Sequence, residues 1–295
     1  MDLEYRHVDV FASGPYSGNS LPVFLDAIGL SAQQMLRMTQ ELRHFEAIFL
    51  ERMPEPGSVS ARVFDLLEEP PFAGHPVIGA AAVLHERAGS DDRCVWKVKL
   101  QGKTVTITTE RTTIGFLGLL DQGPPEMIGS PPDQTWIVPA FGLKPTDLES
   151  QLPVEVVSSG LRYLIVPVIA GVLERARIRR DISSELKAVG AQFAVLLDES
   201  AREVRHWNND GAIEDVATGS AAGTIGAYRL RHGMARSGET FLLHQGRFAG
   251  RPSLLRVRPD GTARKIQNIS VGGLNRGRNP SYARTAGDDC MTSAF

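Results

Sequence analysis

The chain has 295 residues, of which 42% are hydrophobic and 22% are charged, so its composition excludes a mainly disordered protein and its length fits one large domain or two ordinary ones. The 34 acidic residues nearly balance the 32 basic ones, and the net charge of −2 provides no basic footprint for binding nucleic acid. We therefore expect a small-molecule partner and no nucleic acid.

The sequence also argues against membranes and disulfides. Its longest apolar run, residues 164–173, has ten residues, whereas roughly 18 are needed to span a bilayer. The N-terminal residues lack the apolar core of a signal peptide. The two cysteines, Cys94 and Cys290, cannot build a disulfide framework. We expect a cytoplasmic protein with no membrane segment.

The first half combines short strands with two helices. Strand patterns cover residues 8–11, 45–50, 95–100 and 103–108. Residues 31–42 predict an amphipathic helix that opens with a capping box formed by Ser31 and Gln34. Residues 76–86 are apolar around nearly the whole helical circumference, which predicts a buried helix.

The second half repeats this style after residues 121–134, whose four prolines and two glycines predict a domain crossing without regular structure. Strand patterns cover residues 193–197, 203–207, 240–243 and 254–257, and residues 220–230 predict a second buried helix. We therefore expect an N-terminal domain of residues 1–120 and a C-terminal domain of residues 121–273, whose last strand is able to return to the first domain. Residues 274–295 lack apolar periodicity and predict a flexible tail.

The two buried helices begin with segments that look like copies of each other. Residues 69–75 (EPPFAGH) and 214–220 (EDVATGS) match in layout at a constant offset of 145 residues, about half the chain. A small-residue helix among short strands in each half predicts two domains of one α+β design, each a strongly curved sheet wrapped around a central helix. The N-termini of the two helices then face a common cleft.

Such helix starts favour anions. Gly74 and Gly219 precede apolar helical residues, so backbone N–H groups and the positive ends of two helix dipoles point toward the cleft and suit a carboxylate. His75 is favoured as a neutral imidazole by the dipole, and Ser220 is able to cap its helix. The alternative interpretation is that both segments are simply good helix starts.

Two acidic positions stand out beside these starts. Glu46 is the only charged residue in the strand pattern of residues 45–50, and its apolar neighbours favour a raised pKa, which suits a general acid/base. The alternative is a glutamate at the rim of a sheet. Asp215 follows Glu214 five residues before Ser220, so one of the two acids is able to reach the helix start, unless both are solvated.

Other chemistries lack their motifs. The sequence contains no GxxxxGK[ST] phosphate loop, no GxGxxG and no HExxH, and its seven histidines show no metal-ligand spacing with cysteines or acids. We therefore expect no metal and no cofactor.

These residues together resemble the phenazine-biosynthesis isomerase-like (PhzF-like) family, within the diaminopimelate epimerase fold. The resemblance extends to about Gly273, and its most specific motifs are residues 71–76 (PFAGHP), residues 214–223 (EDVATGSAAG) and Gln245-Gly246 followed by residues 250–253 (GRPS).

The resemblance implies two pseudo-symmetric domains, each a barrel-like, mostly antiparallel sheet around a central apolar helix. It also implies a homodimer with a cofactor-independent active site. Glu46 matches the glutamate that removes and returns the substrate proton. His75, Asp215 and Ser220 match residues that shape the polar end of the site, and Gly74 and Gly219 match the helix starts that hold the substrate carboxylate. The implied reaction is similar to that of trans-2,3-dihydro-3-hydroxyanthranilate isomerase.

One departure keeps other functions open. The family commonly reads Asn-Leu-Ser-Glu-Thr around the catalytic glutamate, where this chain has Arg43-His44-Phe45-Glu46-Ala47. A different substrate and a non-catalytic metabolite-binding protein therefore remain alternatives. An epimerase or racemase of the same fold is a third, although it needs a thiol at each helix start, where this chain has His75 and Ser220.

Overall fold

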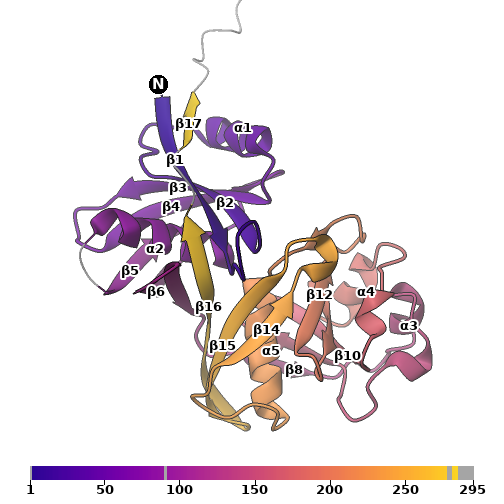
Figure 1. Cartoon of the computed structure of the whole chain (residues 1–295). Coiled ribbons are helices and arrows are strands. Elements are labelled where there is room, and N and C mark those ends of the chain that lie inside the picture. Colours follow the sequence, from indigo (N-terminus) through magenta and orange to yellow (C-terminus); the bar gives the residue numbers. More distant parts are fainter. Residues whose placement is uncertain (1, 90–91, 278–280, 285–295) are drawn as a thin grey trace, which may run out of the picture.

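The computed structural model of the chain describes residues 2–89, 92–277 and 281–284. The protein is a mixed α+β structure in which a large sheet and few helices form two lobes (Figure 1). We call residues 2–121 the N-terminal lobe and residues 122–269 the C-terminal lobe.

The N-terminal lobe is a closed ring of strands around one helix. Its elements are β1 (Asp2–Val10), β2 (Asn19–Phe24), α1 (Ala32–Leu42), β3 (Glu46–Arg52), β4 (Ser58–Asp65), α2 (Gly74–Ala88), β5 (Arg93–Lys99), β6 (Thr104–Thr112) and β7 (Gly115–Asp121). Strands β1 to β7 pair in chain order, and β16 (Lys265–Gly277) pairs with both β7 and β1, which closes the ring. Helix α2 lies inside and packs on strands from both sides of the ring.

The C-terminal lobe wraps a second helix. Its elements are β8 (Glu126–Gly129), α3 (Ile137–Ala140), η1 (Pro145–Asp147), β9 (Glu155–Ser158), β10 (Arg162–Val168), η2 (Val172–Glu174), α4 (Ser183–Ala188), β11 (Phe193–Asp198), β12 (Glu203–Trp207), β13 (Glu214–Asp215), α5 (Gly219–Arg231), β14 (Phe241–Gln245), η3 (Arg247–Ala249) and β15 (Ser253–Thr262). The pairing runs from β8 through β12 to β14, β15 and β16. Helix α5 packs on β9, β10, β15 and β16.

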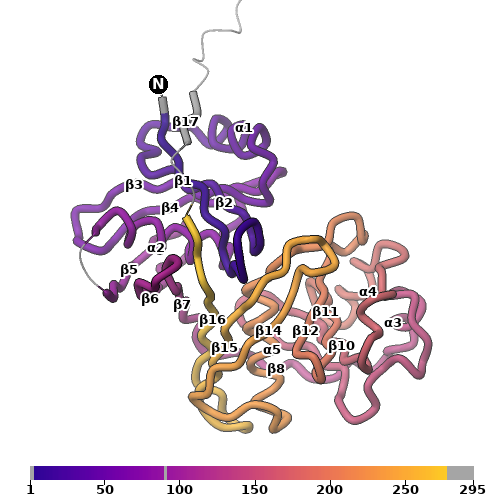
Figure 2. The backbone as a smooth tube through the Cα atoms, in the orientation of Figure 1, coloured from indigo at the N-terminus to yellow at the C-terminus, as the bar shows by residue number. Residues whose placement is uncertain are grey.

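Strand β16 connects the two lobes. It pairs with β15 through its first residues, with β7 through residues 270–275, and with β1 through residues 275–277 (Figure 2). We expected a flexible tail from residue 274, but residues 274–277 end β16 and residues 281–284 form β17, which pairs with β1. These pairings join opposite ends of the chain, and a local pattern cannot reveal them. The rest of the expected tail, including Cys290, lies outside the described residues.

The predicted helices are confirmed, and their sequences explain their positions. Helix α1 starts at the expected capping box of Ser31 and Gln34 and covers β3 and β4 from outside. Helices α2 and α5 are buried over most of their length, as their uniformly apolar surfaces predict. They begin at Gly74 and Gly219, which reproduces the 145-residue offset of the two copied segments.

One local prediction was wrong. Residues 121–134 were expected to lack regular structure, but they contain β8, which pairs with β9. The prolines flank this strand and do not interrupt it, so its backbone donors remain available for pairing.

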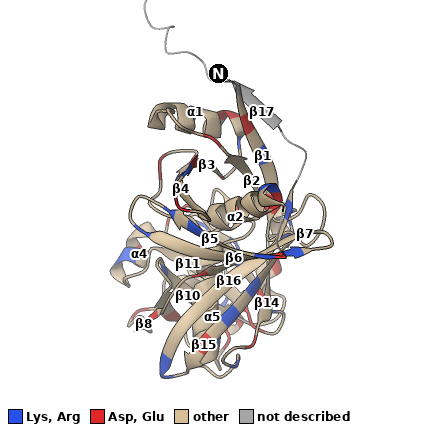
Figure 3. Cartoon of the chain, turned by 90° about the vertical axis from the view of Figure 1, so that its left-hand side faces the viewer, with Lys and Arg blue, Asp and Glu red and all other residues tan. Residues whose placement is uncertain are grey.

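Charged residues of both signs occur in both lobes. Basic and acidic positions are interspersed along the ribbon of both lobes (Figure 3). Among the helices that the structure describes, none combines the length and the apolar character of a membrane span.

Candidate active site

Glu46 and His75 form a buried pair. Glu46 begins β3 and shares its face with Ile48 and Leu50, which belong to the main core around α2. His75 is the second residue of α2. The Glu46 carboxylate oxygen Oε2 lies 3.0 Å from His75 Nδ1, and the two side chains are only 18% and 8% exposed. The fold therefore holds an acid and an imidazole together, away from most of the solvent.

Burial sets the protonation of this pair. It raises the pKa of Glu46 to about 8, and the negative charges of Asp215 and Asp65 act in the same direction. Burial also lowers the pKa of His75, against the opposing effect of Asp215, so the imidazole is neutral at pH 7. A neutral His75 was expected from the helix dipole, whereas the cause that lowers its pKa in this structure is desolvation. A carboxyl group with a pKa close to neutrality is able to release and take up a proton, as a general acid/base must.

The second ring nitrogen of His75 is also notable. His75 Nε2 is buried and has no hydrogen-bond partner among the described residues. A buried polar atom of this kind is costly unless a ligand or water satisfies it. The atom is therefore positioned to contact a bound polar group.

Asp215 reaches the start of α5 from β13. Its carboxylate accepts hydrogen bonds from Thr218 Oγ1 at 2.5 Å and from the backbone N–H of Ala217 at 3.2 Å. Asn19 Nδ2, from β2 of the other lobe, donates to the same carboxylate at 3.3 Å. Gln245 Nε2 donates to the backbone oxygen of Asp215 at 2.9 Å. Asp215 is thus fixed where the two lobes meet.

Glu214 has a different partner, which sequence reasoning missed. The fully buried Arg205 donates to both of its carboxylate oxygens, from Nε at 2.8 Å and from Nη2 at 2.5 Å. Arg205 Nη1 also donates to the backbone oxygens of Leu173 and Ala176. The acidic pair is therefore not simply solvated: Glu214 anchors the strand, and Asp215 faces the helix start. Arg205 lies within a short strand pattern, where nothing in its neighbours signals a partner.

Ser220 makes a contact that differs from the expected cap. The residue before α5 is Thr218, and no side chain caps this helix. The Ser220 hydroxyl lies 2.8 Å from the hydroxyl of Tyr163, on β10. Burial raises the pKa of Tyr163, and the charges of Asp215 and Glu46 add to this shift, so the phenol stays protonated. Ser220 is drawn to Tyr163 because that hydroxyl is buried and needs a partner.

Two further residues hold the first turn of α5. Gln122 Nε2 donates to the backbone oxygen of Gly219 at 3.0 Å, and Ser159 Oγ donates to that of Ser220 at 3.1 Å. Sequence reasoning missed Gln122, Ser159 and Tyr163. Tyr163 looks like a core residue within an apolar run, and the other two lie in loops with no local motif.

The structure places the predicted site residues around the junction of the lobes. Glu46 contacts His75, and the charge of Asp215 acts on both. Ser220 contacts Tyr163, whose pKa responds to Glu46 and Asp215. Helices α2 and α5 come within 8 Å of each other, measured between Cα atoms.

The helix starts at Gly74 and Gly219 remain the predicted anion site. Neither α2 nor α5 has a side-chain cap, so their first N–H groups are not satisfied by capping. Among the described residues, no group of three or more His, Cys, Asp or Glu side chains is arranged to hold a metal ion.

Comparison with known proteins identifies the family. The model of the phenazine biosynthesis-like proteins (PhzC-PhzF) matches residues 8–275. The chain belongs to this family. A relative from Pseudomonas chlororaphis named trans-2,3-dihydro-3-hydroxyanthranilate isomerase is 31% identical over 278 residues, covering 91% of this chain and 95% of the relative.

Solved structures agree with this assignment to the PhzC-PhzF family. A predicted epimerase from Pseudomonas aeruginosa, whose structure is solved, has 44% sequence identity to this chain and a TM-score of 0.89. The match covers 96% of this chain and 100% of the epimerase chain. A PhzF-family phenazine biosynthesis protein from Bacillus anthracis has the same fold, with 21% identity, a TM-score of 0.84, and coverage of 96% and 99%. Relatives are named isomerases and epimerases, and this chain is an enzyme of that class.

Proposed function

We propose that the chain is a cofactor-independent isomerase that moves a proton on a small carboxylate-bearing metabolite, with Glu46 as the single acid/base. The observation that carries this proposal is the buried contact of 3.0 Å between the Glu46 carboxyl group and His75 Nδ1. The relative named trans-2,3-dihydro-3-hydroxyanthranilate isomerase supports a reaction of the same type.

In the proposed reaction, Glu46 performs both proton transfers. As a carboxylate it removes a proton from a substrate carbon: the C–H bond breaks, an O–H bond forms on Glu46, and the electron pair spreads into the unsaturated system of the substrate. The O–H bond then breaks, and the proton is delivered to another carbon of that system. A pKa of about 8 leaves the two forms of Glu46 close in free energy near neutral pH, which favours transfer in both directions.

The other site residues have positioning roles in this proposal. Neutral His75 orients the Glu46 carboxyl group through Nδ1, and its buried Nε2 is available to the substrate. The uncapped starts of α2 and α5, at Gly74 and Gly219, hold the substrate carboxylate. Asp215 and Ser220 shape the polar end of the site.

We also infer that the two lobes are pseudo-symmetric domains of the diaminopimelate epimerase type. The supporting observation is that each lobe has a sheet around one buried helix, and the two helices begin 145 residues apart, at Gly74 and Gly219.

The thiol-dependent epimerase alternative has less support. The second residues of the helices are His75 and Ser220, and Cys94 lies on β5, outside both helices. Alkylating the cysteines of the whole chain tests this alternative, since a two-thiol enzyme is inactivated and the proposed enzyme is not.

The decisive test is Glu46→Gln, which keeps the shape of the side chain but cannot act as a base. We expect turnover of trans-2,3-dihydro-3-hydroxyanthranilate, or of a related cyclic acid found by screening, to fall by roughly 10²–10⁴-fold. Deuterium incorporation from heavy water into the substrate measures the proton transfer itself. Glu51→Gln, on the same strand, is the matched control and should retain activity.

The same experiment separates the remaining alternative. A non-catalytic binding protein shows saturable affinity for the acid but no deuterium incorporation, even in the wild-type chain. Wild-type exchange rates in Glu46→Gln would remove Glu46 from its assigned role.

A further inference from the structure

A cavity of about 340 Å³ lies beside the proposed active site. It is lined by His7, Asn19, Ser20, Arg43, His44, Phe45, Val216 and Arg251. Phe45 and Val216 are the chain neighbours of Glu46 and Asp215, and Asn19 donates directly to the Asp215 carboxylate. The cavity therefore borders the catalytic acid and its neighbouring acid, with walls from both lobes.

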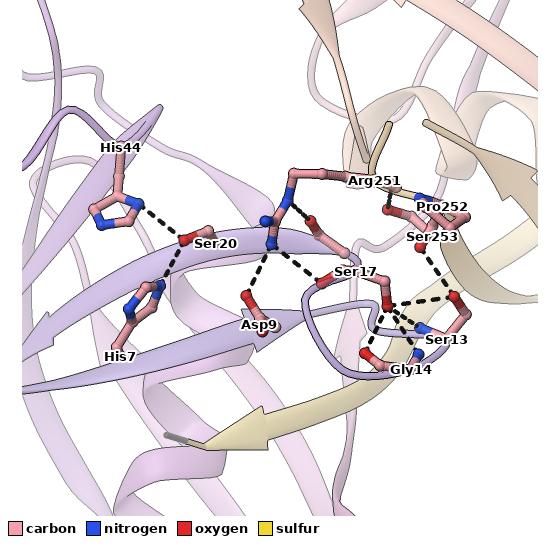
Figure 4. Close-up of polar contacts among 11 residues, drawn as sticks. His7, Asp9, Ser13, Gly14, Ser17, Ser20, His44, Arg251, Pro252 and Ser253 are labelled. Atoms are coloured by element: carbon pink, nitrogen blue, oxygen red, sulfur yellow. Dashed lines mark hydrogen bonds and ion pairs between the residues drawn. The ribbon is translucent and has the colours of Figure 1, made fainter. Parts of the chain in front are cut away.

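The charged and titratable side chains on the cavity wall are all basic: two arginines and two histidines, with no acid among its lining residues. Arg251 is partly neutralised, because its Nη2 donates to the buried carboxylate of Asp9 at 2.9 Å (Figure 4). Arg43 is exposed and lines the cavity wall. Arg43 thus places a positive charge on the wall of this cavity, and such a charge attracts a negatively charged group.

The two histidines are joined through one hydroxyl. His7 Nε2 lies 2.6 Å and His44 Nδ1 lies 2.8 Å from Ser20 Oγ, and both rings point toward that oxygen (Figure 4). A hydroxyl has one proton, so it donates to one ring nitrogen and accepts from the other. These two hydrogen bonds fix both rings. His7 comes from β1, and His44 comes from the loop before β3.

The backbone of Arg43 gives an independent observation. Arg43 ends α1 in the left-handed region, at φ 57° and ψ 28°. Helices commonly place glycine in this conformation, because a side chain is unfavourable there. Arg43 therefore lines the cavity from a backbone conformation that glycine adopts more easily.

We propose that this cavity is a specificity subsite for a second oxyanion on the substrate, a carboxylate or a phosphate, in addition to the carboxylate at the helix starts. Arg43 supplies the charge, and the hydrogen bonds to Ser20 hold the His7 and His44 rings in place on the cavity wall. The assignment to substrate recognition rests on the proposed function. It names the substrate class as a small acid with two anionic groups.

Inorganic phosphate is the probe. It is titrated into the whole chain, and binding is followed from the NMR signals of the His44 ring, assigned with His44→Gln. Arg43→Gly removes the charge and also relieves the backbone, so it should retain or raise the thermal stability while weakening phosphate binding at least fivefold.

Arg202→Gly is the matched control. Arg202 is also an exposed arginine with positive φ, 49°, but it lies in the C-terminal lobe, before β12. This variant should change phosphate affinity by less than twofold. Equal affinity of wild-type and Arg43→Gly chains for phosphate, or phosphate signals confined to other histidines, would overturn the subsite.

Turnover distinguishes a substrate subsite from a separate anion site. Phosphate should raise the KM of the wild-type enzyme without changing kcat, and Arg43→Gly should lose this inhibition. Phosphate that binds at His44 without competing with substrate overturns the substrate role. Deuterium exchange by Glu46→Gln reports on the proposed function independently, so the two proposals fail in distinguishable ways.

Discussion

The carboxyl group of Glu46 lies in surroundings that disfavour its ionised form. The residue shares a strand face with core residues, and the negative charges that raise its pKa belong to Asp215 and Asp65. An ordinary surface glutamate would be fully ionised at pH 7. Here the protonated and ionised forms are both accessible, and the same environment that suits proton transfer makes the folded state sensitive to pH.

Glu46 should therefore destabilise the fold as the pH rises. The unfolded chain releases this proton near pH 4.5, whereas the folded chain holds it up to about pH 8. The stability of the folded state is therefore unaffected by Glu46 below pH 4.5, and it decreases as the pH rises from 4.5 to about 8. Glu46→Gln removes this loss, so its stability relative to wild type should increase by on the order of 3 kcal/mol between pH 5 and pH 8.5. Urea denaturation at both pH values measures the difference.

His75 acts in the opposite sense and must be kept in the comparison. Its lowered pKa means that the folded state disfavours protonation, so acid destabilises the fold below the ordinary histidine value of 6.5. Both chains retain His75, so its effect largely cancels. Glu51→Gln provides the control, and a pH-independent difference between Glu46→Gln and wild type would contradict the raised pKa.

Helices α2 and α5 depend on small residues because strands surround them. A Cβ on Gly79 would lie 2.6 Å from Leu21 Cδ2 and 2.8 Å from Val10 Cγ2. A Cβ on Gly226 would lie 2.6 Å from Val257 Cγ1. Such contacts are too short for packed carbon atoms, so the glycines allow the helices to approach their sheets. The close approach holds the helix starts where the lobes meet.

Replacing either glycine with alanine should destabilise the protein. In an exposed helix, alanine is more favourable than glycine by about 1 kcal/mol. Overpacking between helix and sheet should outweigh this gain, so we expect Gly79→Ala and Gly226→Ala to be about 1–3 kcal/mol less stable than wild type. Chemical denaturation measures the loss. Gly102→Ala is the control, because a Cβ there meets nothing within 4 Å. Stabilisation by either helical substitution would show that the sheets are able to move aside.

The two lobes share parts at the scale of the molecule. Strand β16 belongs to both sheets, and one continuous core includes residues that pack on α2 and on α5. Polar links also cross between the lobes, from Arg251 to Asp9 and from Asn19 to Asp215. Neither lobe completes its sheet or its core alone.

The lobes should therefore unfold together. Trp96 lies in the N-terminal lobe, and Trp136 and Trp207 lie in the C-terminal lobe, so fluorine-labelled tryptophan reports on both in one urea titration. We expect the three signals to change with the same midpoint, because opening one lobe removes β16 from the other. A separate, earlier transition of Trp96 would show that the N-terminal lobe unfolds independently.

Local patterns were enough to predict the three long helices and to single out candidate residues for the site. The capping box at Ser31, the apolar circumference of α2 and α5, and their repeated starts were readable because they depend on neighbours three or four positions away. Glu46 was identifiable as a candidate acid/base because it is the only charged residue in an apolar strand pattern.

Contacts between distant segments were beyond any such pattern. The pairing of β16 with β1, the bond between Ser220 and Tyr163, and the meeting of Arg205 with Glu214 depend on how strands close around the helices. The magnitude of burial around Glu46 and His75 is likewise a property of the closed core. Hydrophobic periodicity determines which face of an element is buried, but only the packed structure decides which polar groups are buried together and therefore which protons are held.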